Sequence, residues 1–195
     1  MTDPPSPNLI MNWSLRPATM DDVPALEALI RLSVRTLQAG FYSPAQSEAA
    51  LGTVFGVDRQ LILDGTYFVA IQDDQIVGCG GWSWRRSIYG SDRATEARDD
   101  TALDPRHDAA RIRACFVHPA WARRGIGRGI LIECEAAILR AGFLRAELVG
   151  TLAGEALYGA CGYHIVERTT LPLSGGDHLP VVRMSRQLRP VISGK

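Results

Sequence analysis

The chain reads Arg123-Arg124-Gly125-Ile126-Gly127-Arg128-Gly129 between a short apolar run, residues 112–117, and a segment with the periodicity of a helix. In that segment apolar side chains recur at intervals of three and four residues, which is typical of the buried face of a helix. They are Leu131, Cys134, Ile138 and Ala141. Gly142 predicts the C-terminal end of this helix. The stretch therefore predicts a strand, a glycine-rich turn and a helix in succession.

The turn, residues 123–129, has the properties of a phosphate site, and we call it the cradle. The first turn of a helix carries N–H groups without partners at a positive dipole end, where phosphate binds readily. Glycines at 125, 127 and 129 remove side chains that would hold a diphosphate away from these groups. Arginines at 123, 124 and 128 add charge-assisted donors. The pattern predicts that the cradle binds a diphosphate.

Two other interpretations of the glycines are open, and a third is excluded. A glycine-rich bend can simply let a helix pack close to a sheet, but three glycines with three arginines favour phosphate. A dinucleotide-binding turn needs G-x-G-x-x-G directly after its strand. Here Ile130 replaces the third glycine and residues 118–121 intervene, although Glu147 lies at the spacing of a ribose-binding acid. No Gly-Lys-Ser/Thr follows, which excludes a Walker P-loop.

Composition favours one domain that acts on a small molecule. The 195 residues suit a single compact domain, and 21 basic residues balance 21 acidic ones. This balance favours neither nucleic acid nor an anionic membrane as a partner. No run reaches the length of a membrane span, and the N-terminus does not resemble a signal peptide. We expect a cytoplasmic protein.

Cysteine and histidine usage predicts no metal site. The four cysteines lie in apolar runs without C-x-x-C spacing, and the four histidines are scattered. Buried thiols in a reducing compartment are therefore expected. The cysteines are Cys79, Cys115, Cys134 and Cys161.

Residues 1–12 contain three prolines and predict a disordered leader, so we place a single domain at 13–190. Residues 13–16 predict a strand, and Thr19 or Asp21 is expected to cap a helix. The buried face of that helix is predicted to hold Leu26, Leu29, Ile30, Ser33 and Leu37. A weaker helix is expected from Ser43-Pro44 to Val54. Further expected elements are a hairpin of 66–71 and 75–84, strands at 145–150, 163–169 and 179–187, and a short helix at 154–160.

Residues 85–110 are polar, charged and without periodicity. A connection of this length inside a compact domain is usually functional or disordered. We expect it to overhang a site, with its charges solvated.

Two motifs in order resemble those of the GNAT-type N-acetyltransferases. Phe116-Val117-His118-Pro119 followed by Arg124-Gly125-Ile126-Gly127 is similar to the family's acetyl-coenzyme A motif. Leu157-Tyr158 and Gly162-Tyr163 are similar to its Leu-Tyr…Gly-Phe/Tyr signature. The opening Leu15-Arg16-Pro17-Ala18-Thr19 also resembles the family's first strand and helix entry. The resemblance covers nearly all of the predicted domain.

The resemblance implies a fold and a cofactor. The fold is an α/β (α+β) domain with a central mixed, mostly antiparallel seven-stranded sheet flanked by helices. Strands four and five would splay to admit acetyl-CoA, whose pantetheine arm would bond to backbone near Phe116 and Val117, where a backbone N–H would polarise the thioester. Thr151 stands where the family often has asparagine at the end of strand five. A homodimer is compatible with the resemblance.

The implied reaction is direct transfer of the acetyl group to an amine, with Tyr158 as the acid that protonates the departing thiolate. A tyrosine on a short helix often only packs its ring in a core. A non-catalytic acyl-CoA sensor, which would not need Tyr158, is the alternative. Cys115 and Cys161 could act as nucleophiles, but no histidine adjoins either in sequence.

The general base is not determined by the sequence. Some family members carry a glutamate at the head of strand four, where this chain has Arg111, and Ala122 replaces a polar residue of the cofactor motif. Glu147, Glu155, His118 and a water chain to bulk solvent are all open as the base. For the substrate we expect contacts with aromatic side chains, which are Phe41, Tyr42, Trp82 and Trp84.

Overall fold

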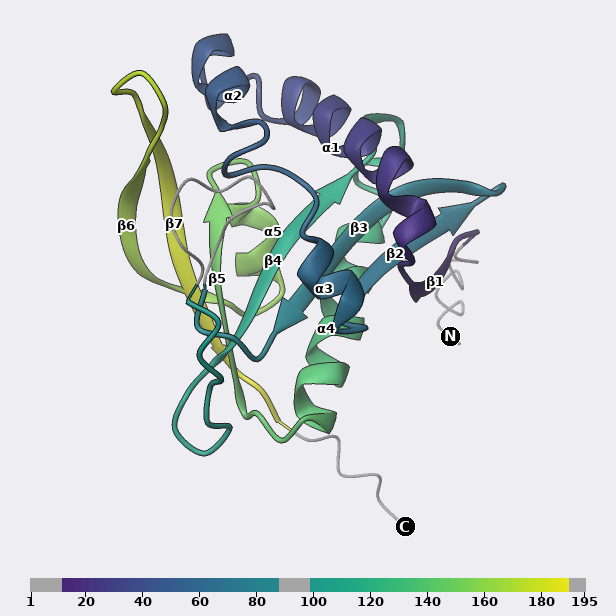
Figure 1. Cartoon of the computed structure of the whole chain (residues 1–195), viewed down its shortest axis with the longest axis vertical. Helices are drawn as coiled ribbons and strands as arrows, with labels where there is room; N and C mark the ends of the chain where they lie inside the picture. The colour runs from purple at the N-terminus through teal and green to yellow at the C-terminus, as the bar shows by residue number, and fades with distance from the viewer. Residues whose placement is uncertain (1–11, 88–98, 190–195) are drawn as a thin grey trace, which may run out of the picture.

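The computed structural model of the chain describes residues 12–87 and 99–189. A seven-stranded sheet with strand order β1-β2-β3-β4-β5-β7-β6 forms its centre (Figure 1). The strands are β1 Ser14–Pro17, β2 Tyr67–Gln72, β3 Gln75–Ser83, β4 Ala110–Val117, β5 Arg145–Thr151, β6 His164–Pro172 and β7 His178–Gln187. The α-helices are α1 Val23–Leu37, α2 Pro44–Ala50, α3 Arg59–Leu63, α4 Ile126–Arg140 and α5 Glu155–Ala160. Two short 3₁₀ helices are η1 Met20–Asp22 and η2 Pro119–Trp121.

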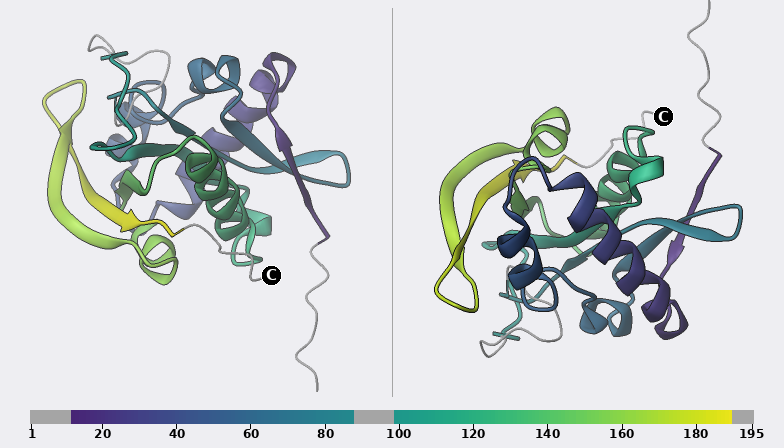
Figure 2. Two further views of the ribbon diagram at one scale, coloured as in Figure 1. Left: turned by 90° about the horizontal axis from the view of Figure 1, so that it is seen from below. Right: turned by 90° about the horizontal axis from the view of Figure 1, so that it is seen from above.

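The sheet is mixed and mostly antiparallel, as predicted. Only β4 and β5 pair in parallel, and the other five neighbouring pairs are antiparallel. Helices cover both faces: α4 lies in front of the sheet in the left view of Figure 2, and α1 in the right view. Each face has its own hydrophobic core, one packed against α1 and the other against α4 and α5. The predicted fold class is confirmed.

The helix after the cradle forms as the apolar periodicity predicts. Gly125, with φ 82°, is the N-cap of α4, and Gly142, with φ 90°, follows its C-terminal end. Leu131, Cys134 and Ile138 are buried. Ala141 is exposed, contrary to expectation, because it lies one residue beyond the end of α4. Ile126 and Ile130 extend the buried face toward the N-terminus instead.

The N-terminal half differs in detail from the prediction. Thr19 caps η1, and α1 begins one turn later at Val23. Ser43 caps α2 as expected, but α2 ends at Ala50, and the sequence analysis missed α3. Asp73 and Asp74, at φ 47° and 59°, form the predicted hairpin turn between β2 and β3. Residues 1–11 of the expected leader lie outside the described residues.

The connection of residues 85–110 is partly described, since residues 88–98 lie outside the described residues. Its two ends are hydrogen-bonded to each other beside the end of β3: Arg86 N donates to Thr101 O, and Leu103 N donates to Trp84 O. Arg85 forms two hydrogen bonds to Asp64, at 3.0 and 3.1 Å, just after α3. Within the described residues no helix is apolar over a length sufficient to span a membrane.

Strand β4 carries an irregularity that determines where a site can form. Cys79 pairs with Phe116 but Gly81 with Arg113, so β4 has one residue more than β3 in this interval. Ala114 lies in this bulge with a left-handed φ of 57°. On its other side β4 pairs with β5 only as far as Ile112 and Leu148. Beyond the bulge the two strands diverge toward the top of Figure 1.

Candidate active site

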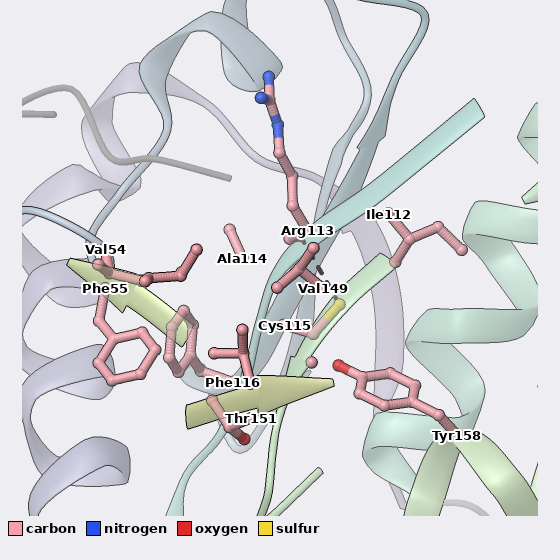
Figure 3. Close-up of a pocket in the computed structure, with 13 residues that line it drawn as sticks. Val54, Phe55, Ile112, Arg113, Ala114, Cys115, Phe116, Val149, Thr151 and Tyr158 are labelled. Atoms are coloured by element: carbon pink, nitrogen blue, oxygen red, sulfur yellow. Dashed lines mark hydrogen bonds between the residues drawn. The ribbon is translucent and has the colours of Figure 1, made fainter. Parts of the chain in front are cut away.

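A cavity of about 60 Å³ lies where β4 and β5 diverge (Figure 3). By the same measure a single water needs roughly 10–15 Å³, so the cavity suits a small group. Its walls are mostly apolar, with a thiol and two hydroxyls among them. The lining residues are Val54, Phe55, Ile112, Arg113, Ala114, Cys115, Phe116, Val149, Gly150, Thr151, Tyr158, Leu171 and Val181.

The cradle follows η2 and includes the first turn of α4. A Cβ at Gly125 would meet no atom within 4 Å, so the space in front of this residue is open. Residues 126–128 form the first turn of α4, where N–H groups have no partner within the helix. This arrangement fits a diphosphate, which needs close approach to backbone donors at a positive helix end.

The three cradle glycines have different surroundings. A Cβ at Gly127 would lie 2.9 Å from Leu157 Cδ2, and one at Gly129 would lie 2.1 Å from Trp13 Cη2. The N–H of Gly129 donates to Gly125 O inside α4. Gly129 therefore makes room for Trp13, and its expected role at the phosphate stays a prediction. The expected donors are the amides of residues 126–128.

Two of the cradle arginines take up distinct positions. The guanidinium of Arg124 lies over the Trp121 ring, 4.5 Å from its centroid. Arg123 has a left-handed φ of 64° and lies two residues before Gly125, whose φ is 82°. The side chains of residues 123, 124 and 128 are exposed, so they are accessible to an anion. Their role as phosphate donors stays a prediction.

Tyr158 projects from α5 into the wall of the cavity (Figure 3). Its ring fits where glycines leave room, since a Cβ at Gly150 or Gly154 would lie 2.8 or 2.9 Å from the ring carbon Cε2. The hydroxyl lies beside the thiol of Cys115. Burial raises the pKa of Tyr158 well above its ordinary value. The phenol therefore keeps its proton at neutral pH and presents it to the cavity.

The two candidate nucleophiles are poorly suited to that role. Burial raises the pKa of the Cys115 thiol to about 12, so the thiolate is scarce at neutral pH. Burial also raises the pKa of Cys161, which does not line the cavity. Cys115 Sγ contacts Arg113 O at 3.7 Å. These environments favour direct transfer over a covalent enzyme intermediate.

For the acetyl transfer that the resemblance implies, we expect Cys115→Ala to keep its activity within about threefold, because the protonated Cys115 thiol is a poor nucleophile. The measurement is the steady-state rate, together with mass spectrometry of enzyme quenched during turnover. Wild type should show no acetylated enzyme. A loss of 100-fold or more in the variant at unchanged stability, or an acetyl group on Cys115 in wild type, would contradict this expectation.

The buried thiols and phenols also predict a loss of stability at alkaline pH. Burial raises the pKa of Cys79 to about 12, and it also raises the pKa values of Tyr67 and Tyr158. Above pH 9 these groups ionise in the unfolded chain but not in the folded one, so the free energy of unfolding falls as pH rises. At pH 11 Cys79 alone should account for about 3 kcal/mol. Urea denaturation under reducing conditions from pH 8 to 11 measures this slope, which should be shallower in Cys79→Ala.

The three side chains considered as a general base have partners of their own. Glu147 pairs with Arg111 and Arg183. Glu155 pairs with Arg168, whose hydrogen bonds lower the pKa of that carboxyl and weaken it as a base. His118 Nδ1 accepts from the Ala120 amide. Among the described residues that line the cavity, none is one of these three.

The predicted aromatic contacts divide between the two faces of the sheet. Tyr42 is buried on the α1 face, where its hydroxyl donates to Pro180 O and accepts from the Leu152 amide. Phe41 beside it is 53% exposed. Trp82 packs with Trp84 and Phe143 in the α4 core, so these tryptophans do not share a site with Phe41 and Tyr42. The four side chains therefore do not form one site, and their role as substrate contacts stays a prediction.

Sequence reasoning missed part of the cavity wall. Phe55, Leu171 and Val181 come from segments distant in the chain, and only the fold brings them together with Phe116. Phe55 and Phe116 meet edge to face, with ring centroids 6.0 Å apart. No spacing rule could have identified these residues, because they come from separate segments of the chain that meet only in the hydrophobic core against α1.

Arg113 is another residue of the cavity wall that the sequence did not point to. It forms a buried ion pair with Asp58, with Nε 3.1 Å from Oδ2, and its Nη1 donates to Ser87 O at 2.9 Å. The pair links the segment before α3, the 85–110 connection and the β4 residue that precedes the bulge. Within residues 12–87 and 99–189 no group of three or more potential metal ligands occurs.

Comparison with known proteins agrees with this geometry. Residues 63–165 match the profile of the acetyltransferase (GNAT) domain. No curated protein matches the chain by sequence. A GCN5-related N-acetyltransferase from Rhodopseudomonas palustris is similar in structure, with TM-score 0.67 and 20% identity over 90% of this chain and 95% of that one.

Two further solved structures were obtained with the cofactor. The PaiA N-acetyltransferase from Thermoplasma acidophilum, in complex with coenzyme A, has TM-score 0.62 and 16% identity over 90% of this chain and 98% of that one. The YncA protein from Salmonella typhimurium, with acetyl-CoA, has TM-score 0.61 and 16% identity over 94% and 98%. At these identities the likeness shows a common fold.

Proposed function

The chain belongs to the GNAT acetyltransferase family, and from this premise we propose that it moves the acetyl group of acetyl-CoA directly onto the primary amine of a small molecule. The observation that carries the proposal is the cavity between β4 and β5, with the Tyr158 hydroxyl in its wall. The enzyme is an acyltransferase, and its acyl donor is acetyl-CoA.

We assign the binding of acetyl-CoA to the cradle and to β4. The amides of residues 126–128 and the arginines at 123, 124 and 128 would bind the diphosphate. Backbone groups of Phe116 and Val117, which lie in the part of β4 that no longer pairs with β5, would bind the pantetheine arm. Thr151, at the end of β5, lines the opposite wall. Acetyl-CoA supplies the activated acyl group when bound.

Tyr158 holds the proton that the departing sulfur needs. Its burial disfavours the phenolate, so the proton moves only as negative charge grows on the sulfur. For the amine we infer that its proton leaves through water, because the three side chains considered as bases are engaged elsewhere. The apolar walls, which include Phe55 and Leu171, exclude bulk water from the acyl group.

The small size of the cavity and the even charge balance of the chain support a small acceptor. The test is thiol release from acetyl-CoA with a panel of aralkylamines, polyamines, amino acids and peptides with free N-termini. We expect small primary amines to exceed the peptides at least tenfold in kcat/KM. Peptides as the best substrates would overturn the small-molecule assignment, and no release with any amine would overturn the transferase itself.

A cytoplasmic location and a homodimer stay predictions.

A further inference from the structure

The carbonyl of Ala114 turns out of the β4 ladder at the bulge and is held by a buried tyrosine. Tyr67 Oη donates to Ala114 O at 3.0 Å, and the Tyr67 side chain is fully buried in the α1 core. The Cys79 thiol lies 3.9 Å from the same carbonyl oxygen. Two buried donors from β2 and β3 thus converge on one peptide group of β4.

The backbone around this peptide is unusual. Ala114 has a φ of 57°, which a residue other than glycine adopts only where its surroundings impose it. Two glycines of β3 make the room. A Cβ at Gly80 would lie 2.6 Å from Cys115 Sγ, and one at Gly81 would lie 2.7 Å from Tyr67 Cδ2. Neither Cys115 nor Tyr67 could lie where it does beside a larger residue.

The orientation of the carbonyl fixes that of the next amide. In a trans peptide the C=O and N–H bonds point in opposite directions. Because Ala114 O points to Tyr67, the N–H of Cys115 points away from it. Cys115 lines the cavity beside the Tyr158 hydroxyl. The hydrogen bond from Tyr67 therefore sets the direction of the N–H of Cys115, a residue that lines the cavity.

We propose that Tyr67 is a positioning residue for acyl transfer: its hydroxyl locks the Ala114–Cys115 peptide, so that the Cys115 amide is a fixed donor toward the acyl oxygen. This inference rests on the proposed function. A donor fixed in advance stabilises developing charge without reorganisation, and removing one such donor typically costs about 10²–10³ in kcat. Loosening its orientation should cost less. Tyr67 does not touch the reactants and acts only through the peptide.

The test is Tyr67→Phe, which removes the hydroxyl and keeps the ring. We expect kcat to fall about 10–100-fold while KM for acetyl-CoA changes less than threefold, since the cradle is intact. In NMR spectra without cofactor, the Ala114 carbonyl and Cys115 amide signals should shift, and the Cys115 amide should exchange faster with solvent. The control is Tyr163→Phe, another buried tyrosine that loses only its hydroxyl, for which neither readout should change.

The two readouts separate failure of this inference from failure of the proposed function. An inactive wild type overturns the proposed function, while the NMR comparison still decides whether Tyr67 holds the peptide. Unchanged kcat, or unchanged Cys115 signals, in folded Tyr67→Phe overturns the positioning role. Should the variant not fold, the wild type is sufficient: its Tyr67 hydroxyl proton must exchange slowly and show a contact to Ala114, and rapid exchange would overturn the role.

Discussion

Gly125→Asp should weaken acetyl-CoA binding about 100-fold. Gly125 is exposed at the N-cap of α4, and a Cβ there meets nothing within 4 Å, so the cost of a side chain at this site is the strain of its left-handed φ of 82°. The new carboxylate would stand where the cradle is expected to hold the diphosphate. Two like charges about 5 Å apart repel by roughly 3 kcal/mol at an effective dielectric constant of about 20, and water and salt screen part of this. Calorimetric titration with acetyl-CoA measures the loss.

Gly125→Asn is the matched control for this experiment. Asparagine and aspartate have nearly the same shape, both tolerate the left-handed φ of 82°, and both are good helix N-caps. Aspartate should even stabilise α4 through the helix dipole, so weaker binding cannot be attributed to a weaker fold. We expect the asparagine variant to bind within about fivefold of wild type. Equal affinities of the two variants would refute the assignment of the diphosphate to the cradle.

Tyr158→Phe should lower kcat by about 10²–10³ and leave acetyl-CoA binding nearly unchanged. The ring packs against Gly150 and Gly154, and phenylalanine fills the same space. Only the proton donor is lost, and a positioned acid typically contributes about 10²–10⁴ to the rate. Because burial raises the pKa of Tyr158, the wild-type rate should not decline up to pH 10 through ionisation of this phenol. Steady-state rates with the best amine, measured from pH 6 to 10, check both statements.

Tyr163→Phe serves as the control, since it removes a hydroxyl from a neighbouring buried tyrosine whose ring centroid lies 6.2 Å from that of Tyr158. Its kcat should stay within about twofold of wild type. A Tyr158→Phe enzyme that keeps a tenth or more of wild-type kcat would exclude Tyr158 as the acid and leave water in that role.

The parts of the fold that depend on local pattern were predictable from sequence. The helix after the cradle follows from its apolar spacing, and the β2–β3 hairpin from two β-rich runs around Asp73-Asp74. The mixed sheet in which β4 and β5 diverge came from the family resemblance and not from periodicity.

What the sequence could not reveal depends on contacts between distant segments. Gly129 looks like its neighbours in a glycine-rich turn, and only the approach of Trp13, more than a hundred residues earlier, gives it a packing role. Trp82 and Trp84 share aromatic character with Tyr42, but the two tryptophans pack in the core against α4 and Tyr42 packs in the core against α1. In the sequence Tyr67 looks like an ordinary strand residue. Its hydroxyl can reach Ala114 O because Gly80 and Gly81 of β3, which lies between β2 and β4, have no side chains in the way.

The most direct test of the active-site assignment is a crystal structure of the protein with coenzyme A. We predict that the diphosphate accepts hydrogen bonds from the amides of residues 126–128, and that the coenzyme sulfur lies between β4 and β5 within hydrogen-bonding distance of the Tyr158 hydroxyl. A diphosphate bound away from the start of α4, or a sulfur out of reach of Tyr158 with another donor beside it, would contradict the account.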